Sequence, residues 1–444
     1  MFAKLLRVSS RFVGLVGLEG FLTLLAVALL PWQARYIKRV GDLAGVPWEQ
    51  GTVSLFATEL VIFAALLVHV IRRRPNAERL ESPWHFRLWA LFLLFAGLSI
   101  TWARVPTAAF FTWVSLIVGF VLAYLIWQSR LGLRAFAAAF VLGNVPNALL
   151  GAWQFLAQRA FASTWLGVAE HLPSSAGSVV VETATGRFLR AYGLAPHPNI
   201  FGAFMAAALI LAFALALTSV TRRFRRVWII LATLFLVGLA VSFSRSAFLA
   251  VGVAFFLAFT RRRFWRPEVR ARFRRSFAVL VLATALLALV LGPLLTTRAL
   301  GTGRLEGQSV SERILSIDQG IQLFWTHPEI GVGLGNFQVA AYDEAEPRLT
   351  DAYEYQPAHF VPILVGAELG VFGLFLLLGA VWLWVMEARA YCRLLMGPLE
   401  MAALFLPVIP ILAGCFDHWP LTAYAGILLT GLLFGLSLKA ERSA

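Results

Sequence analysis

Long apolar runs separated by short arginine-rich segments constrain this chain more than any other feature. Residues 199–218 form one such run without a charged side chain, and about 20 residues is the length that a helix needs to cross a bilayer. Hydrophobic residues make up 60% of the 444 residues and charged residues 14%, whereas soluble domains are about half apolar and a quarter charged. We therefore expect an all-α membrane protein, folded as one polytopic domain over residues 1–444.

The number and orientation of the spans follow from the run lengths and from the arginines. Placing the N-terminus in the cytoplasm puts about two thirds of the 38 Lys and Arg residues on that side, which is the positive-inside pattern of membrane proteins. Both termini are then cytoplasmic. The twelve predicted spans are approximately 12–30, 54–71, 87–101, 107–127, 135–156, 199–218, 227–242, 246–260, 277–297, 359–385, 400–416 and 421–438.

Two predicted external segments are longer than ordinary connections. One covers residues 158–198, and the larger covers residues 298–358, between the ninth and tenth spans. Within the larger loop, Ser309-x-x-Glu312 is a capping-box sequence, and apolar residues follow it at helical spacing. This pattern predicts a helix that lies on the membrane surface or packs on the top of the bundle. Arg313 would project from this helix toward lipid phosphate or toward solvent.

Arg190 closely precedes the apolar run 199–218 and is the first candidate for binding an anion. A guanidinium group matches the oxygens of a phosphate or diphosphate, although an arginine at a membrane interface also commonly extends to water. Arg187 lies nearby and would either assist or be an ordinary loop residue. Asn199 follows Pro198 at a predicted helix start, where free N–H groups and the helix dipole favour a negative charge.

Arg245 lies between two apolar runs that leave no room for a loop, and Ser242, Ser244 and Ser246 flank it. A charge at this depth is costly and usually marks a site for an ionic substrate; a solvated turn is the alternative. The serine hydroxyls would accept hydrogen bonds from the guanidinium group and fix its direction.

His359 opens the tenth predicted span and is a candidate general base. An imidazole with an ordinary pKa near 6.5 removes a proton from a hydroxyl near neutral pH; a structural role is the alternative. Glu368 is too far along the same span to contact His359, and we expect it to brace the bundle through a buried hydrogen bond. Asp417 lies in the turn before the last span, where it would orient an arginine or a histidine or face solvent.

Several function classes are disfavoured by the sequence. The net charge of +15 is concentrated in short stretches between apolar runs, which does not indicate nucleic-acid binding. No group of histidines and carboxylates has the spacing of a metal-binding motif, and no nucleotide-binding motif is present. We therefore predict neither a metal ion nor a cofactor.

The candidate residues occur in short motifs that resemble the O-antigen ligase and polymerase family of bacterial membrane glycosyltransferases. The similarity covers approximately residues 185–435, and the earlier spans are similar only in hydropathy. The similar pieces are Arg190-Ala191-Tyr192-Gly193 with Pro198-Asn199, Phe243-Ser244-Arg245-Ser246, Trp325-x-His327-Pro328-x-x-Gly331-Val332-Gly333-Leu334-Gly335-Asn336-Phe337, His359 with Glu368-Leu369-Gly370-x-x-Gly373, and Asp417-His418.

The resemblance implies a fold and an activity. The fold would be a GT-C-like bundle of twelve spans in the bacterial inner membrane, with the active site on the periplasmic face. The enzyme would move a glycan from an undecaprenyl diphosphate carrier to a hydroxyl acceptor, with inversion and without a metal. Arg190 and Arg245 would bind the diphosphate, and His359 would activate the acceptor hydroxyl. Phe360 follows His359 where the family often has asparagine, so another group would have to replace that amide.

Several alternatives remain open at this point. An O-antigen ligase would use lipid A–core as the acceptor, a polymerase would use another carrier-linked repeat, and a protein O-oligosaccharyltransferase would use a side-chain hydroxyl. We favour the ligase type because the single large loop directly precedes His359. A twelve-span transporter is the alternative from another class, but no pair of Gly- or Pro-broken spans occupies matching positions in two halves of the sequence. A structural membrane component would not need the external arginine pair.

Overall fold

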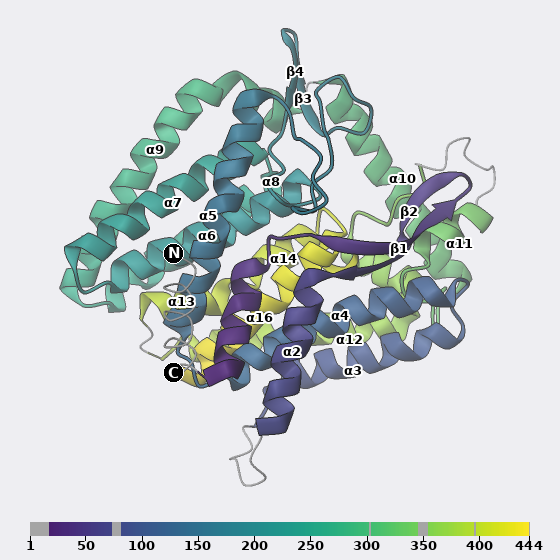
Figure 1. The fold of residues 1–444 in the computed structure, drawn as a ribbon, viewed down its shortest axis with the longest axis horizontal. Coiled ribbons are helices and arrows are strands. Elements are labelled where there is room, and N and C mark those ends of the chain that lie inside the picture. The colour runs from purple at the N-terminus through teal and green to yellow at the C-terminus, as the bar shows by residue number, and fades with distance from the viewer. Residues whose placement is uncertain (1–16, 73–80, 302, 345–353, 395–396, 444) are drawn as a thin grey trace, which may run out of the picture.

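The structure is a computed structural model that describes residues 17–72, 81–301, 303–344, 354–394 and 397–443, and it is predominantly helical (Figure 1). The first helix described covers Gly17–Leu29. The helices that follow are α2 (Ala57–Arg72), α3 (Trp84–Leu98), α4 (Pro106–Gln128), α5 (Leu133–Ala157), α6 (Pro198–Thr218), α7 (Arg222–Ser242), α8 (Arg245–Arg261), α9 (Pro267–Leu300), α10 (Arg304–Thr326), α11 (Phe337–Glu344), α12 (Val361–Tyr391), α13 (Pro398–Phe405), α14 (Val408–Gly414), α15 (Trp419–Thr422) and α16 (Tyr424–Ser443).

Eight of the helices are long and apolar enough to cross a membrane, which confirms a multi-pass membrane protein. Each of the twelve predicted ranges contains a helix, although residues 12–16 lie outside the described part of the chain. Four of these helical segments are shorter than a typical span: Gly17–Leu29, Ala57–Arg72, Arg245–Arg261 and the interrupted pair Pro398–Gly414. The count of twelve spans and the placement of the loops therefore stay predictions.

The expectation of a purely helical chain is wrong in two places. β1 (Arg35–Leu43) and β2 (Val46–Phe56) form an antiparallel hairpin, and β3 (Val180–Thr183) pairs with β4 (Gly186–Leu189) in a shorter one. Ala44 and Gly45 both have positive φ, at 53° and 84°, which is what a tight two-residue hairpin turn requires. Both hairpins lie almost entirely outside the apolar runs, and only the last three residues of β2 fall within the predicted span 54–71.

The helix predicted in the larger loop exists, but its start was predicted wrongly. α10 begins at Arg304 after the N-cap residue Gly303, so Ser309 lies inside the helix and caps nothing. The capping-box sequence is therefore incidental, because the residues before it also adopt helical geometry and continue the same helix.

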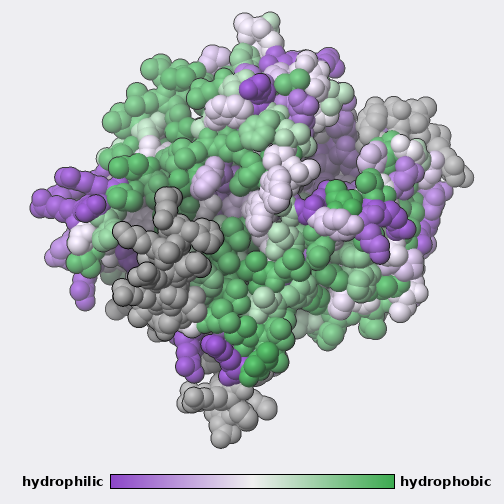
Figure 2. Space-filling model, viewed as in Figure 1, coloured by the Kyte–Doolittle hydropathy of each residue, from purple (hydrophilic) through white to green (hydrophobic). Residues whose placement is uncertain are grey.

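α6 forms the centre of the bundle, since every residue from Pro198 to Leu217 is buried. It packs against α5, α7, α8 and α13. The outer helices instead expose large apolar side chains, as α9 does at Leu282, Leu289 and Val290. Figure 2 shows apolar side chains over much of one face, with the most hydrophilic groups at its margins. Such a continuous apolar surface is expected of a protein whose solvent is lipid.

α12 is interrupted where a glycine-rich loop packs against it. Gly370 has φ 63° and ψ −164°, which breaks the helical geometry. The loop supplies replacement hydrogen bonds: Val332 N donates to the carbonyl of Ala367 at 3.0 Å, and Gly333 N donates to that of Glu368 at 2.9 Å. Non-helical backbone at membrane depth is tolerated when protein groups satisfy it in this way.

The Glu368 side chain joins the same contact. Its Oε1 accepts a hydrogen bond from Phe337 N at 3.3 Å, and the side chain is buried. The prediction that Glu368 braces the bundle through a buried hydrogen bond is therefore confirmed. The glycine-rich loop and α12 are thus fixed to each other by backbone and side-chain contacts together.

Substituting Gly370→Ala should destabilise the bundle. A Cβ at Gly370 would lie 2.2 Å from the carbonyl oxygen of Glu329, at a positive φ that side chains disfavour. This combination of φ and ψ is essentially restricted to glycine and costs another residue about 1–3 kcal/mol, and the contact adds to it. Thermal unfolding of the detergent-solubilised protein, followed by tryptophan fluorescence, should show a clear decrease in Tm. Gly252→Ala in α8 is the matched control, because nothing lies within 4 Å of its Cβ position; an equal Tm for both variants would contradict this account.

Candidate functional site

Arg190 is held in place by the backbone on both sides of it. Its N–H donates to the carbonyl of Val179 at 3.1 Å, at the edge of the β3–β4 hairpin, and Ala191 N donates to the carbonyl of Val241 at 3.0 Å, near the end of α7. The segment therefore joins the hairpin to α7, and its direction is fixed before the Arg190 side chain makes any contact.

Two buried amides of α5 clamp the residues that follow. Gln154 Oε1 accepts hydrogen bonds from Tyr192 N at 3.0 Å and from Gly193 N at 2.7 Å. Asn147 Oδ1 accepts from Leu194 N at 2.8 Å. Gly193 has φ 57°, and a Cβ there would lie 2.2 Å from Asn147 Oδ1. Glycine is therefore required for the clamp, which explains the Tyr-Gly pair after Arg190.

The Arg190 side chain connects three segments through a chain of hydrogen bonds. It is only 1% exposed, with Nε donating to the carbonyl of Ser242 at 2.8 Å and Nη2 donating to Asn199 Oδ1 at 2.7 Å. Asn199 Nδ2 then donates to Asp417 Oδ2 at 2.8 Å. Burial, followed by the nearby charge of Arg298, lowers the pKa of Arg190. Within the described residues Nη1 has no hydrogen-bond partner, so one edge of the group is available to a ligand.

Arg245 lies at the first position of α8, directly after a tight turn. Phe243 adopts φ 49° there, which places the end of α7 next to the start of α8. The flanking serines do not hold Arg245 as expected. Ser242 Oγ donates to the carbonyl of Leu239 at 2.6 Å, and Ser244 Oγ lies 3.5 Å from Ser246 Oγ. The Arg245 side chain is instead exposed, and its charged neighbours are Arg298, Arg313 and Glu306.

The charged groups around Arg190 and Arg245 include a buried ion pair. Arg298, near the end of α9, contacts Glu306 in the first turn of α10, and both are buried. Both residues act electrostatically on Arg190 and on Arg245. Neither Arg298 nor Glu306 was among the candidates predicted from the sequence. A single arginine near the end of an apolar run is common at a membrane interface, so Arg298 does not stand out.

One ring nitrogen of His359 takes part in a hydrogen bond, and the other is available to accept a proton. Ser316 Oγ donates to the carbonyl of Arg313 at 3.0 Å, so it accepts from His359 N and from His359 Nδ1, each at 3.3 Å. The ring proton therefore belongs on Nδ1, and Nε2 keeps a lone pair. The ring meets that of His418 edge to face, with centroids 4.9 Å apart.

Asp417 and His418 complete the cluster from the turn before α15. Asp417 Oδ1 accepts from His418 N at 2.8 Å, and His418 Nδ1 lies 2.6 Å from Thr422 Oγ1. Burial alone would raise the pKa of Asp417, but the three neighbouring histidines and the Asn199 amide outweigh it and lower the pKa to about 2. Asp417 is thus an ionised, buried carboxylate and not a solvated turn residue.

Of the two remaining candidates, Arg313 belongs to the cluster and Arg187 does not. Arg313 on α10 acts electrostatically on Asp417, His359 and His418. Arg187 lies on β4, and its Nε is 3.3 Å from Glu182 Oε1 in the same hairpin. Among the described residues Arg187 therefore pairs with Glu182 of its own hairpin. It contacts no member of the His359 cluster.

The cluster combines an excess of positive charge with a possible ligand set for a metal. Four guanidinium groups (Arg190, Arg245, Arg298 and Arg313) face three carboxylates (Glu306, Glu312 and Asp417). His359, Asp417 and His418 also offer ligand atoms that all lie within 4.8 Å of one another. The four guanidinium groups disfavour an additional cation, whereas they favour an anion of matching charge.

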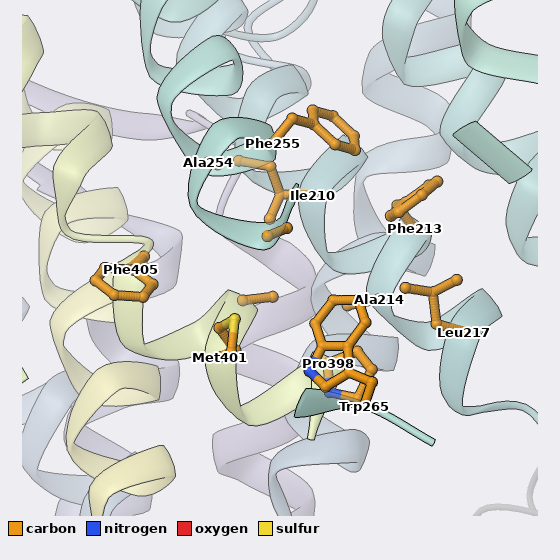
Figure 3. Close-up of a pocket in the computed structure, with 12 residues that line it drawn as sticks. Ile210, Phe213, Ala214, Leu217, Ala254, Phe255, Trp265, Pro398, Met401 and Phe405 are labelled. Atoms are coloured by element: carbon orange, nitrogen blue, oxygen red, sulfur yellow. The ribbon is translucent and has the colours of Figure 1, made fainter. Parts of the chain in front are cut away.

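The apolar cavity in Figure 3 lies elsewhere. It has a volume of about 40 Å³ and is lined by side chains such as Ile210, Phe255 and Phe405, from α6, α8 and α13. None of its lining residues is titratable, so it offers packing space and no chemistry for an ionic substrate.

Residues 230–378 match the sequence profile of the O-antigen ligase family. Over this segment, about a third of its length, the chain is similar to O-antigen ligase family enzymes. The matched segment includes Arg245, Arg298, Glu306, Arg313 and His359, so it carries most of the charged cluster. No curated protein matches the chain. The resemblance identified from the motifs is confirmed, and so is the prediction of an enzyme of the ligase and polymerase type.

Arg190, Asn199 and Asp417 lie outside the matched segment but are joined to it by contacts. Ser242, which accepts from Arg190, belongs to the segment, and so does His359, whose ring meets that of His418. His418 was quoted in the motif but given no role, since only the fold reveals that it faces His359.

Acid pH should destabilise the folded chain through the buried histidines. Burial lowers the pKa of His359 to about 4 and that of His197 to about 3, below the ordinary value of about 6.5. The unfolded chain therefore takes up these protons first, and stability should fall as the pH drops from about 6.5 to about 4. Thermal unfolding measured across this window should show a flatter pH dependence for His359→Gln. Identical slopes for that variant and the wild type would contradict the lowered pKa.

Proposed function

We propose that this enzyme transfers an oligo- or polysaccharide from undecaprenyl diphosphate to a hydroxyl acceptor, as an O-antigen ligase with lipid A–core as the acceptor. The observation that carries the proposal is the hydrogen-bonded connection from Arg190 through Asn199 to Asp417. It links a guanidinium group suited to a diphosphate with the carboxylate beside His359. Donor binding and activation of the acceptor would thus occur in one polar cluster.

The charge balance of the cluster supports a diphosphate donor. A glycosyl diphosphate ester of a lipid carries one negative charge on each phosphate. The four guanidinium groups exceed the three carboxylates by one charge, so the cluster favours an anionic donor. Arg245 and the Nη1 edge of Arg190 would contact the phosphate oxygens, and the Arg298–Glu306 pair would hold the two arginines at a fixed spacing. Guanidinium groups fixed beside a departing diphosphate stabilise its growing charge.

The proposed reaction is a single displacement at the anomeric carbon. The acceptor oxygen forms a bond to this carbon while the bond to the diphosphate oxygen breaks, and the electron pair leaves with the diphosphate. The acceptor proton moves to Nε2 of His359, which carries a lone pair in the observed hydrogen-bond pattern. Attack from the face opposite the leaving group inverts the configuration.

The environment of His359 suits this role. The lowered pKa, about 4, keeps the imidazole neutral at the pH of a cell envelope, so Nε2 can accept a proton. It also makes the ring a weaker base than an ordinary histidine, so the imidazolium needs a stabilising partner. The ionised Asp417 nearby would stabilise the imidazolium that forms. The missing asparagine at the position of Phe360 would be compensated by polar groups from other elements, namely Ser316 and His418.

The proposed orientation places the cluster on the periplasmic face of a bacterial inner membrane, with both termini in the cytoplasm. The ends of α7 support it: Arg222 to Arg226 lie in the first turns, whereas Ser242 at the last turn contacts Arg190. A basic cluster at one end of a span is typical of its cytoplasmic side, so the Arg190 end would be external.

A polymerase and a protein O-oligosaccharyltransferase are the alternatives within the family, and the glycans of a deletion strain separate them. Full-length polymer that stays on the lipid carrier indicates a ligase, single repeats on the carrier indicate a polymerase, and loss of glycan from proteins alone indicates protein glycosylation. A transporter is disfavoured by the family match. The interrupted helices α12 and α13–α14 are neighbours in sequence, and so they do not correspond across two halves.

Arg245→Ala should abolish glycan transfer in the complemented deletion strain while the protein remains in the membrane. Arg245→Lys should restore only part of the activity, because an ammonium group lacks the bidentate fork. Arg190→Ala should have the same effect on transfer, with a loss of stability in addition, since it leaves Asn199 and Ser242 without their donor. Arg187→Ala is the control and should transfer normally. Full activity of Arg245→Ala would remove the diphosphate role.

His359→Ala should lower the transfer rate by about 10²–10⁴ if the imidazole is the general base. The purified enzyme, with a synthetic carrier-linked donor, provides the rate, and donor binding should change much less than turnover. Treatment of the wild type with EDTA separates this role from metal binding by His359, Asp417 and His418. Unchanged activity after EDTA supports the base; strong inhibition that Zn²⁺ or Mn²⁺ reverses would assign these residues to a metal instead.

A further inference from the structure

A second cluster of ionisable side chains lies far from the His359 cluster. His85 begins α3, Glu387 is near the end of α12, and Glu441 is near the end of α16. Their ligand atoms all lie within 4.8 Å of one another. Glu387 follows His359 by 28 residues along the chain, which corresponds to roughly 40 Å of helix. The two clusters are therefore independent.

The three side chains leave polar atoms unsatisfied in the interior. His85 Nδ1 contacts Glu387 Oε2, and Glu387 Oε1 accepts from Trp84 N at 2.9 Å. His85 Nε2 and Glu441 Oε2 are buried, however, and neither has a hydrogen-bond partner among the residues that the structure describes. His85 is 0% exposed and Glu441 is 5% exposed. An unpaired buried polar atom costs about 1–3 kcal/mol, so two in one cluster indicate a missing partner.

The charges of the cluster do not balance either. Among the ion pairs of the described residues, Glu387 meets His85 and Glu441 meets none. The nearby Arg442 directs its Nη1 to the carbonyl of Trp127, at 3.3 Å. With both carboxylates ionised, at least one negative charge remains in a bundle of low polarity, and without a cation a proton on Glu441 would have to remove it. A divalent cation would neutralise both carboxylates with the imidazole neutral.

We propose that His85, Glu387 and Glu441 bind a divalent transition-metal ion that ties together the ends of α3, α12 and α16. One imidazole and two carboxylates are ligands that Zn²⁺ and Mn²⁺ accept. Ligand atoms around such an ion lie about 3.4 Å apart, so the observed spread needs only a small contraction. His85 would bind the ion through Nδ1, which already faces Glu387 Oε2, and the unpartnered Oε2 of Glu441 would complete the set.

A neighbouring cavity provides space for the water that would complete the coordination. It has a volume of about 60 Å³, and His85, Trp89 and Leu438 are among its lining residues. A water molecule needs about 10–15 Å³ of such space. Trp89 Nε1 is also buried without a partner, and a metal-bound water can accept its hydrogen bond. The ion would thus account for Glu441 Oε2, and water in the cavity would account for His85 Nε2 and Trp89 Nε1.

The test uses the full-length protein in detergent, stripped with a chelator and dialysed. Zn²⁺ and Mn²⁺ are then added separately, and binding is measured by equilibrium dialysis together with the change in Tm. The wild type should take up one equivalent at this site and become more stable. Glu441→Gln and Glu387→Gln should each weaken binding by about tenfold or more. Absence of metal uptake, or uptake that both variants leave unchanged, would overturn the proposal.

Two control variants locate the ion. His69→Gln alters another pair, with His69 Nδ1 at 2.9 Å from Glu19 Oε1, and should not weaken binding. Asp417→Asn disrupts the trio beside His359 and should also leave it unchanged, whereas a loss of binding in Asp417→Asn would place the ion there instead.

A measurement on the wild type alone covers the case in which Glu441→Gln fails to fold. Fe²⁺ with ascorbate and hydrogen peroxide cleaves the backbone near a bound iron ion. Fragments should end close to residues 85, 387 and 441. Cleavage confined to the neighbourhood of residues 359 and 417 would refute the site.

Discussion

The buried guanidinium group of Arg190 is the interaction on which the arrangement of the site depends. A charge that is 1% exposed is stable in an apolar bundle only if its hydrogen bonds are made. Its partners come from separate elements, with the Ser242 carbonyl at the end of α7 and Asn199 at the start of α6. Asn199 in turn holds Asp417. The need to solvate one arginine therefore brings three helix ends together, and His418 and His359 are adjacent to the carboxylate as a result.

A second constraint sets the position of His359. The glycine-rich loop 331–335 bonds to the interrupted part of α12, and Glu368 accepts from Phe337 N in the same contact. α12 is therefore fixed in depth relative to the segment 331–337, and His359 precedes its first turn. Ser316 on α10 then holds the ring itself. The backbone of α12 and a side chain of α10 thus determine together where Nε2 is presented.

The sequence predicted the parts of this site that carry a charge next to an apolar run. Arg190, Arg245 and His359 were found in this way, and Asn199 from its place after a proline at a helix start. The helices were predicted where hydropathy marks them. The β1–β2 hairpin was missed because β1 is largely exposed and because neither strand forms an apolar run long enough to stand out. Arg298, Glu306 and His418 were missed because their importance depends on which residues they face. Hydropathy and local motifs describe single segments, whereas the contacts between α9, α10 and the turn before α15 exist only in the folded bundle.

Polar contacts fix α12 at three depths, and this explains why a long apolar helix has a defined register. Apolar side chains pack against lipid and against other helices with similar energies, so they define the depth of a helix only weakly. His359 next to the start of α12, Glu368 at its interruption and Glu387 near its end each require a specific partner. A metal ion at Glu387 would strengthen the last of these contacts and couple α12 to α3 and α16. Because Gly370 interrupts the helix between the two clusters, loss of that ion should affect the stability of the bundle more than the geometry around His359.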